Sequence, residues 1–149
     1  MYARDLDARK NPVLYRITNE TNILNQTDDD IRRFSKDNFT SKYVVIVTFG
    51  RIMVFGKPEE RQSFQAVIAS NYKKTYVIMN YANLTMEATT GFYDKDCGVG
   101  KTINFTDSGD SRLLAESSNV GVKGRHVHLL ASGICEGNFF FFCFCNYVP

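Results

Sequence analysis

The chain has two histidines, His126 and His128, and they lie two residues apart directly after the segment SSNVGVKGR at 117–125. In an extended strand, side chains two residues apart leave the same face, so both imidazoles could bind one metal ion. A third ligand would have to come from elsewhere, and Cys97 is the candidate. One hypothesis is therefore a metal-binding or metal-dependent enzyme domain that uses His126, His128 and Cys97.

A structural interpretation of the same segment is preferred, because a His-x-His pair on a strand is a weak motif. Both rings would cover one half-exposed face of the strand while Val127 and Leu129 fill the core. Gly121 and Gly124 flank a Val-Lys pair, and they are expected to supply positive φ angles or close backbone approach in the turn that enters this strand. On this interpretation the segment serves the fold, and no metal or cofactor site is expected.

Three consecutive aspartates, Asp28, Asp29 and Asp30, also suggest a cation. Successive carboxylates on a helix point to different sides, and no DxDxDG loop with a distal glutamate accompanies them. The run therefore predicts a solvated helix turn rather than a calcium site.

No segment predicts catalysis. Ser117 and Ser118 lack a GxSxG turn, and GVGKT at 98–102 does not complete a phosphate-binding loop, so no catalytic residue is expected. The net charge is only +2, with Lys and Arg scattered along the chain, and no nucleic-acid partner is predicted.

Acceptors for N-glycosylation are frequent, since five of the twelve asparagines begin an Asn-x-Thr triplet. This excess favours a secreted protein. The five candidates are Asn19, Asn25, Asn38, Asn83 and Asn104. Asn83 is expected to be protected by a strand, whereas Asn104 is expected to face solvent.

The four cysteines do not indicate whether the chain folds in an oxidising or a reducing compartment. Cys97, Cys135, Cys143 and Cys145 show no zinc spacing and permit three disulfide pairings. Cys97 lies in a polar loop and could reach Cys135, whereas Cys143 and Cys145 would point the same way in an extended run and are not expected to bridge each other.

Neither end of the chain is predicted to be a membrane or export signal. The start, MYARDLDARKNP, has no apolar region behind its basic residues, so no signal peptide is predicted. NFFFFCFCNYV near the end is apolar for about ten residues, about half of what a spanning helix needs. No transmembrane segment is expected in this chain.

Strand patterns dominate between the ends. KYVVIVTF at 42–49 is continuously apolar, as in a strand buried on both faces, and a hairpin or a bend at Gly50 joins it to RIMVFG. The strands expected at 63–70 and 74–86 should pair antiparallel across a short polar connection. KTINFT at 101–106 alternates as a half-buried strand does.

One short helix is predicted near residues 22–35, because Leu24, Ile31 and Phe34 fall near helical spacing and acidic residues precede basic ones. The fold class is therefore mainly β with one short helix (α+β), as a twisted, mostly antiparallel sheet or sandwich-like domain. The predicted core consists of Val44, Ile46, Phe64, Ala66, Ile68, Val77, Met79, Val127 and Leu129.

Several segments together resemble one family. SFQAVIAS, KTYVIMNYANLTM and SSNVGVKGRHVHLL, in this order, are similar to the NIDO domain of nidogen/entactin and related extracellular glycoproteins. ARDLDARKNPVLYRIT, DDDIRRF and VVIVTFGRIMVFG upstream are similar to it too. Where the family tends to carry tryptophan, this chain has Arg4, Phe49, Met86 and His126. The strands that usually come first in the family are not matched, so an edge strand is expected to be unpaired.

The resemblance implies a NIDO-like domain at 1–132, lacking its N-terminal part, and an atypical apolar tail with cysteines at 133–149. It further implies a non-catalytic extracellular module that takes part in cell-matrix adhesion or matrix structure through protein-protein contacts. The partners would be extracellular matrix or cell-surface proteins. The location would be extracellular, or the extracellular part of a membrane protein.

Overall fold

The computed structural model describes residues 6–7, 11, 13–54, 57–85, 92–93, 100–101 and 110–132. Its elements, in chain order, are β1 (Leu6–Asp7), β2 (Val13–Thr18), α1 (Thr21–Ser35), β3 (Tyr43–Val54), β4 (Lys57–Ser70), β5 (Lys74–Asn83), β6 (Phe92–Tyr93), β7 (Gly100–Lys101), the 3₁₀ helix η1 (Ser111–Ala115) and β8 (Arg125–Ser132). The prediction of a mainly β fold with one short α-helix is confirmed.

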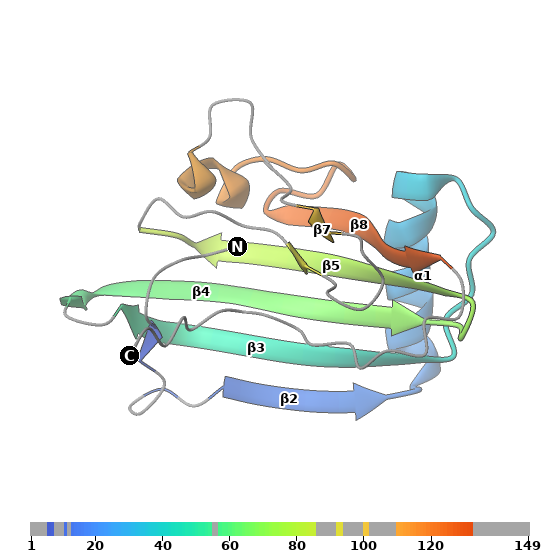
Figure 1. Ribbon diagram of the computed structural model, residues 1–149, viewed down its shortest axis with the longest axis horizontal. Helices are drawn as coiled ribbons and strands as arrows, with labels where there is room; N and C mark the ends of the chain where they lie inside the picture. The colour runs from blue at the N-terminus through green and yellow to red at the C-terminus, as the bar shows by residue number, and fades with distance from the viewer. Residues whose placement is uncertain are drawn as a thin grey trace.

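One six-stranded sheet forms the domain (Figure 1). β3, β4, β5 and β8 follow one another across it, and both β1 and β2 pair with the outer side of β3. Each of these pairings is antiparallel, as predicted. β1 and β2 are therefore outermost on one side and β8 on the other, and β6 and β7 form a separate two-stranded ladder.

The long strands follow the apolar stretches of the sequence. β3 is a bent strand rather than a hairpin, because its pairing with β4 continues past an irregularity between Phe49 and Ile52, where Arg51 has a φ of 54°. The antiparallel pairing predicted for 63–70 and 74–86 is confirmed, although β4 begins earlier, at Lys57. Of the strand predicted at 101–106, the structure describes Lys101 alone; Asn104 lies outside the described residues.

Helix α1 agrees with the prediction at 22–35. Its C-terminus is closed by Lys36, which adopts a left-handed φ of 56° and donates its backbone N–H to the Arg32 carbonyl. The helix crosses the strands at a steep angle near one end of the sheet (Figure 1) and contacts β5 and β8. Ile31, with no exposed surface, is its deepest side chain.

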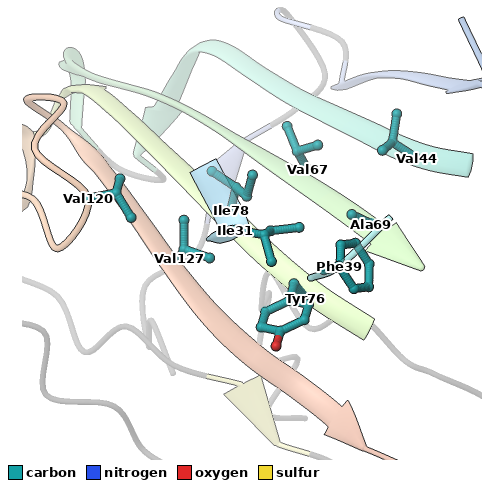
Figure 2. Packing of buried hydrophobic residues seen from close by; sticks show 9 residues of the cluster. All are labelled: Ile31, Phe39, Val44, Val67, Ala69, Tyr76, Ile78, Val120 and Val127. Atoms are coloured by element: carbon teal, nitrogen blue, oxygen red, sulfur yellow. The ribbon is translucent and has the colours of Figure 1, made fainter. Parts of the chain in front are cut away.

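The core lies between α1 and one face of the sheet (Figure 2). The buried cluster contains Ile31, Phe39, Val44, Val67, Ala69, Tyr76, Ile78, Val120 and Val127, with Ile46 packed against it. Of the other predicted core residues, Ala66 and Val77 are buried and Phe64, Ile68 and Met79 are partly buried. Leu129 was wrongly placed in the core: it is 40% exposed, although Val127 on the same strand, β8, is fully buried.

Burial of β3 on both faces was also a wrong prediction for its first half. Within residues 43–49 only Val44 is fully buried, whereas Val45 and Val47 are partly exposed. Val44 lies on the face that α1 covers, and its neighbours in the strand point to the opposite face. Val45 and Val47 therefore point away from α1.

Candidate interaction site

The glycine turn that enters β8 is built around two left-handed positions. Gly121 and Gly124 each have a φ of +75°, which confirms the predicted positive φ angles. A Cβ atom on Gly124 would overlap the Tyr81 carbonyl oxygen, whereas nothing lies near the corresponding position on Gly121. Gly124 also donates its N–H to Ser117 (2.9 Å) and accepts from the Tyr81 N–H (2.7 Å). Close backbone approach therefore requires glycine at 124, and backbone conformation alone favours it at 121.

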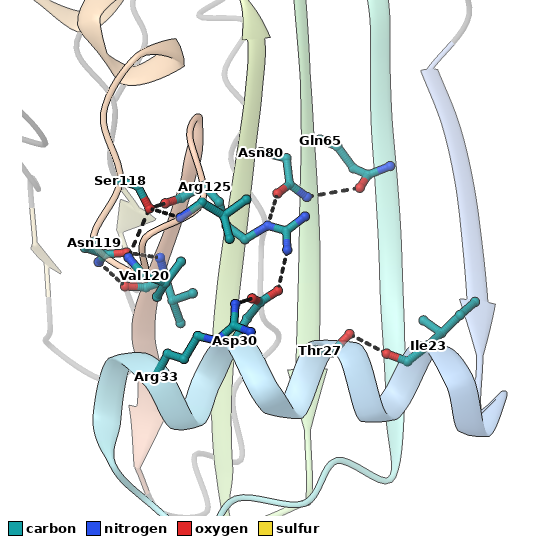
Figure 3. Close-up of polar contacts among 12 residues, drawn as sticks. Ile23, Thr27, Asp30, Arg33, Gln65, Asn80, Ser118, Asn119, Val120 and Arg125 are labelled. Atoms are coloured by element: carbon teal, nitrogen blue, oxygen red, sulfur yellow. Dashed lines mark hydrogen bonds and ion pairs between the residues drawn. The ribbon is translucent and has the colours of Figure 1, made fainter.

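The Ser118 hydroxyl organises the interior of this turn (Figure 3). It accepts the backbone N–H groups of Val120 (3.0 Å) and Val122 (3.1 Å) and donates to the Arg125 carbonyl (2.8 Å). A serine hydroxyl can fill these donor and acceptor roles at once. Ser118 therefore holds the turn in one conformation.

Asn119 closes the outer edge of β8. Its side-chain amide donates to the Val127 carbonyl and its side-chain oxygen accepts the Val127 N–H, both at 2.8 Å (Figure 3). These are the bonds that a neighbouring strand would make with Val127. The turn thus supplies a substitute for a further strand at Val127, and the bond from Ser118 to the Arg125 carbonyl extends it to the start of β8.

Arg125 connects the turn to the helix and to a polar row across the sheet (Figure 3). Its guanidinium bonds Asp30 (2.6 Å) and the Asn80 side-chain oxygen (2.8 Å). Asn80 donates to Gln65 (3.2 Å), and Gln65 donates to Thr48 (2.8 Å). The four residues Thr48, Gln65, Asn80 and Arg125 are cross-strand neighbours on β3, β4, β5 and β8. The Asp30–Arg125 pair has little contact with solvent, so it positions α1 rather than offering a charge to a ligand.

The prediction that Asp28 to Asp30 form a solvated helix turn is wrong for two of the three. Asp28 and Asp30 are buried, and Asp29 alone is exposed. Asp28 accepts the Ser41 backbone N–H at 3.0 Å, and Asp30 accepts Arg125. Because successive helical residues point to different sides, the first and third aspartates reach protein partners while the second reaches water.

His126 does not have the half-exposed environment that was expected for both histidines. His126 is buried, and its Nε2 lies 3.1 Å from the Leu114 carbonyl oxygen and 3.4 Å from the Ser117 hydroxyl. Since a carbonyl only accepts, Nε2 carries a proton toward Leu114 and does not present a lone pair to a metal. Burial lowers the pKa of His126, and the contacts with Leu114 and Ser117 act in the opposite direction.

His128 is partly buried and packs edge-on against Phe34 of α1, with ring centroids 6.1 Å apart. Burial, together with the neighbouring His126, lowers its pKa to about 4. Among the residues that the structure describes, no group of three His, Cys, Asp or Glu side chains could hold a metal ion. Cys97, the proposed third ligand, lies outside that part of the chain.

A family model of the nidogen-like domain (NIDO) matches residues 1–132. The chain belongs to the nidogen-like domain family. Human alpha-tectorin is 29% identical to it over 134 residues, and mouse alpha-tectorin is 28% identical over 134 residues. The match covers 76% of this chain but 6% of each alpha-tectorin, so the chain spans a small part of these curated relatives. No solved structure matches it.

Four of the five glycosylation candidates lie in the described part of this nidogen-like domain. Asn19, Asn25, Asn38 and Asn83 are all exposed, so the expectation that the sheet protects Asn83 is wrong. Asn83 ends β5, where the strand leaves the covered part of the sheet. Asn104 and the disulfide candidates Cys97 and Cys135 lie outside the described residues.

Within the described part of the chain, no helix has both the length and the apolar character needed to cross a membrane.

Sequence reasoning missed three structural roles in this nidogen-like domain. The two hydrogen bonds between Asn119 and Val127, called the bracket below, join residues eight positions apart. The burial of Asp28 and Asp30 depends on partners farther along the chain; Asp30 and Arg125 are 95 residues apart. β2 was not predicted as a strand by itself, although VLYRIT combines aliphatic, aromatic and β-branched residues in the manner of a strand.

Proposed function

We propose that this chain is a non-catalytic extracellular module that acts in cell-matrix adhesion or matrix structure through protein-protein contacts. The observation that carries the proposal is the nidogen-like family match over residues 1–132, with alpha-tectorin among the relatives. Its partners would be extracellular matrix or cell-surface proteins, without a cofactor.

The polar groups that first suggested chemistry are engaged in structure, and this supports a binding rather than a catalytic role. Arg125 and Asp30 bond each other, Ser118 holds the glycine turn, and His126 faces the Leu114 carbonyl. The surface that remains includes large exposed apolar residues on β2 and the exposed asparagines. Both suit a module that meets other proteins outside the cell.

We further propose that residues 1–132 make up the module and that 133–149 lie outside it, with N-glycans on the five Asn-x-Thr asparagines and a disulfide between Cys97 and Cys135. The sites should differ in occupancy. Asn25 begins a triplet inside α1, where the buried Thr27 hydroxyl donates to the Ile23 carbonyl at 2.8 Å. Its modification would have to precede folding of the helix, so Asn25 should carry the lowest occupancy.

The test is expression of the chain behind a heterologous signal peptide in secretory cells, followed by digestion with an N-glycosidase. We expect a ladder of glycoforms that collapses on digestion, and loss of one step in Asn38→Gln. Asn22→Gln is the matched control, because Asn22 is exposed but begins no acceptor triplet. Cells should then adhere to surfaces coated with the secreted module. Secretion without any mobility shift, or no adhesion above that to a coated control protein, would contradict the proposal.

A further inference from the structure

Gln62 is a buried polar side chain near the end of the sheet where β5 stops. It lies on β4 opposite Ile52 of β3 and is 1% exposed. Its side-chain nitrogen donates to the Thr85 hydroxyl at 2.7 Å, and its side-chain oxygen accepts the Thr85 N–H at 3.1 Å. Because β5 ends at Asn83, Gln62 ties the chain that leaves this strand to the sheet, and both polar groups of the buried amide have a partner.

Thr85 is also the third residue of an acceptor triplet for N-glycosylation, Asn83-Leu84-Thr85. The triplet requires a hydroxyl at its third position, so the glycosyltransferase has to contact that hydroxyl when it modifies the asparagine. In the folded domain the Thr85 hydroxyl is bonded to Gln62. The exposure of Asn83 therefore does not by itself make the triplet available to the enzyme.

The asparagine of this triplet is also held against β4. Asn83 faces Ser63 in the β4–β5 ladder. Its side-chain nitrogen, the atom that would carry a glycan, donates to the Arg61 carbonyl at 3.4 Å. Both ends of the triplet thus contact β4, and a transferase can bind the triplet only where the end of β5 has separated from β4.

The Asn19 triplet offers a comparison within the same chain. Asn19, Glu20 and Thr21 are all exposed. Neither the Asn19 side chain nor the Thr21 hydroxyl forms a hydrogen bond with the residues that the structure describes. The folded domain therefore leaves this triplet open, in contrast to the triplet at Asn83.

We propose that Gln62 controls N-glycosylation of Asn83: the glycan is added only while the contact between Gln62 and Thr85 is open, and closure of this contact during folding ends modification of the site. This deepens the glycosylation proposed above and rests on it.

The reaction requires the open triplet, but its product is compatible with the fold. The Asn83 side-chain nitrogen attacks the anomeric carbon of an oligosaccharide carried on a lipid diphosphate. The N–C bond forms as the bond from that carbon to the diphosphate oxygen breaks; the amide proton passes to a base of the transferase, and the lipid diphosphate leaves. The nitrogen keeps one N–H that can still donate to Arg61, and Asn83 is exposed. The contact therefore limits when the site is modified, and an early glycan does not prevent folding.

Closure can compete with the transferase during synthesis, because the strands that position Gln62 precede Thr85 in the chain. β3 and β4 come before β5, and a short turn between Ser70 and Lys74 joins β4 to β5. A hairpin forms in roughly 1–10 μs, whereas synthesis adds about 5–20 residues per second. The contact can therefore form soon after Thr85 emerges.

Gln62→Met tests the proposal, because methionine has a similar length but makes neither hydrogen bond to Thr85. Gln65→Met is the matched control. Gln65 lies on the same strand, donates to Thr48 at 2.8 Å and accepts from Asn80 at 3.2 Å. Each variant loses two hydrogen bonds, so a general loss of stability affects both, whereas only Gln62→Met releases the triplet.

The full chains are secreted from cells in which synthesis of the glycan donor is inhibited, so that they fold without glycans. They are then incubated with oligosaccharyltransferase and a lipid-linked oligosaccharide, and mass spectrometry measures the rate of modification at each site. In wild type, Asn19 should be modified faster than Asn83. The rate at Asn83 should rise about tenfold in Gln62→Met, because loss of two hydrogen bonds raises the population of the open form, and should not rise in Gln65→Met.

Equal rates at Asn83 and Asn19 in folded wild type would overturn the proposal, as would no rise at Asn83 in Gln62→Met or an equal rise in both glutamine variants. The comparison between the two sites uses wild type alone, so it remains decisive if Gln62→Met is not secreted. Modification at Asn19 without the expected difference at Asn83 refutes the role of Gln62 alone. Absence of a glycan at every site, both here and in untreated cells, refutes the proposed glycosylation as well.

Discussion

The two outermost strands of the sheet end in opposite ways. At β8, Asn119 forms both backbone bonds that a neighbouring strand would make with Val127, and the Ser118 hydroxyl engages the Arg125 carbonyl. At β2, the described residues supply no such bracket, and large apolar side chains face solvent. The difference indicates that the glycine turn closes the β8 edge at Arg125 and Val127, whereas the described residues do not close the β2 edge.

The largest effect on the closed edge should come from Gly124→Ala. The added Cβ would overlap the Tyr81 carbonyl oxygen in a left-handed backbone position. We expect a loss of about 2–4 kcal/mol in the free energy of unfolding, measured by urea denaturation. Gly121→Ala is the control, because it has the same φ of +75° but open space around the added methyl; it should cost about 1 kcal/mol. Equal effects would mean that the close approach at 124 is unimportant.

Acid should weaken the β8 side of the domain. His128 has a pKa of about 4, below its ordinary value of 6.5, because it is buried next to His126. The unfolded chain therefore binds a proton at a higher pH than the folded domain does, so stability is full above about pH 6.5 and falls as the pH drops toward 4. The loss should reach at most about 3 kcal/mol.

The pH effect can be assigned by comparing wild type with His128→Gln in urea denaturation at pH 7 and pH 4.5. The variant should lose less stability than wild type over this interval. An identical loss would show that carboxylates rather than His128 dominate the acid response.

Removing the bracket should have an intermediate effect. Asn119→Ala leaves the N–H and C=O of Val127 to water, and since Asn119 is exposed, we expect a cost of about 1–2 kcal/mol. Asn119→Asp keeps the acceptor for the Val127 N–H but loses the donor, so it should fall between Asn119→Ala and wild type. Thermal unfolding followed by circular dichroism would rank the three proteins, and an Asn119→Ala variant as stable as wild type would show that the bracket is unimportant.

Shortening an exposed side chain of β2 should have the smallest effect on the free energy of unfolding. Tyr15→Thr removes a side chain that is 77% exposed and keeps a β-branched residue in the strand. We expect the free energy of unfolding of the dilute monomer to change by less than about 0.5 kcal/mol. A cost comparable to that of Asn119→Ala would indicate that Tyr15 packs within its own chain, which would remove the contrast between the edges.

The sequence predicted features that depend on local pattern. The helix at 22–35 follows from spacing and charge order, the antiparallel β4–β5 pair follows from two apolar runs around a polar turn, and the positive φ of Gly121 and Gly124 follows from a tight glycine turn. These signals lie within short windows of the chain. Local pattern was therefore sufficient for most of the architecture.

Features that depend on distant partners were not predictable in this way. Asp28 and Asp30 were predicted to be solvated because the local sequence does not show their partners. The fold brings Ser41 to Asp28 and Arg125 to Asp30. Leu129 continued the alternation of a core strand, yet it is exposed.

Amide hydrogen exchange, followed residue by residue by NMR, tests the contrast between the two edges most directly. The Val127 amide should exchange slowly in dilute protein and much faster in Asn119→Ala, because Asn119 is its acceptor. Alternate amides of β2, those directed away from β3, should exchange fast. Rapid exchange at Val127, or protection of every β2 amide in the dilute monomer, would contradict the account of one closed and one open edge.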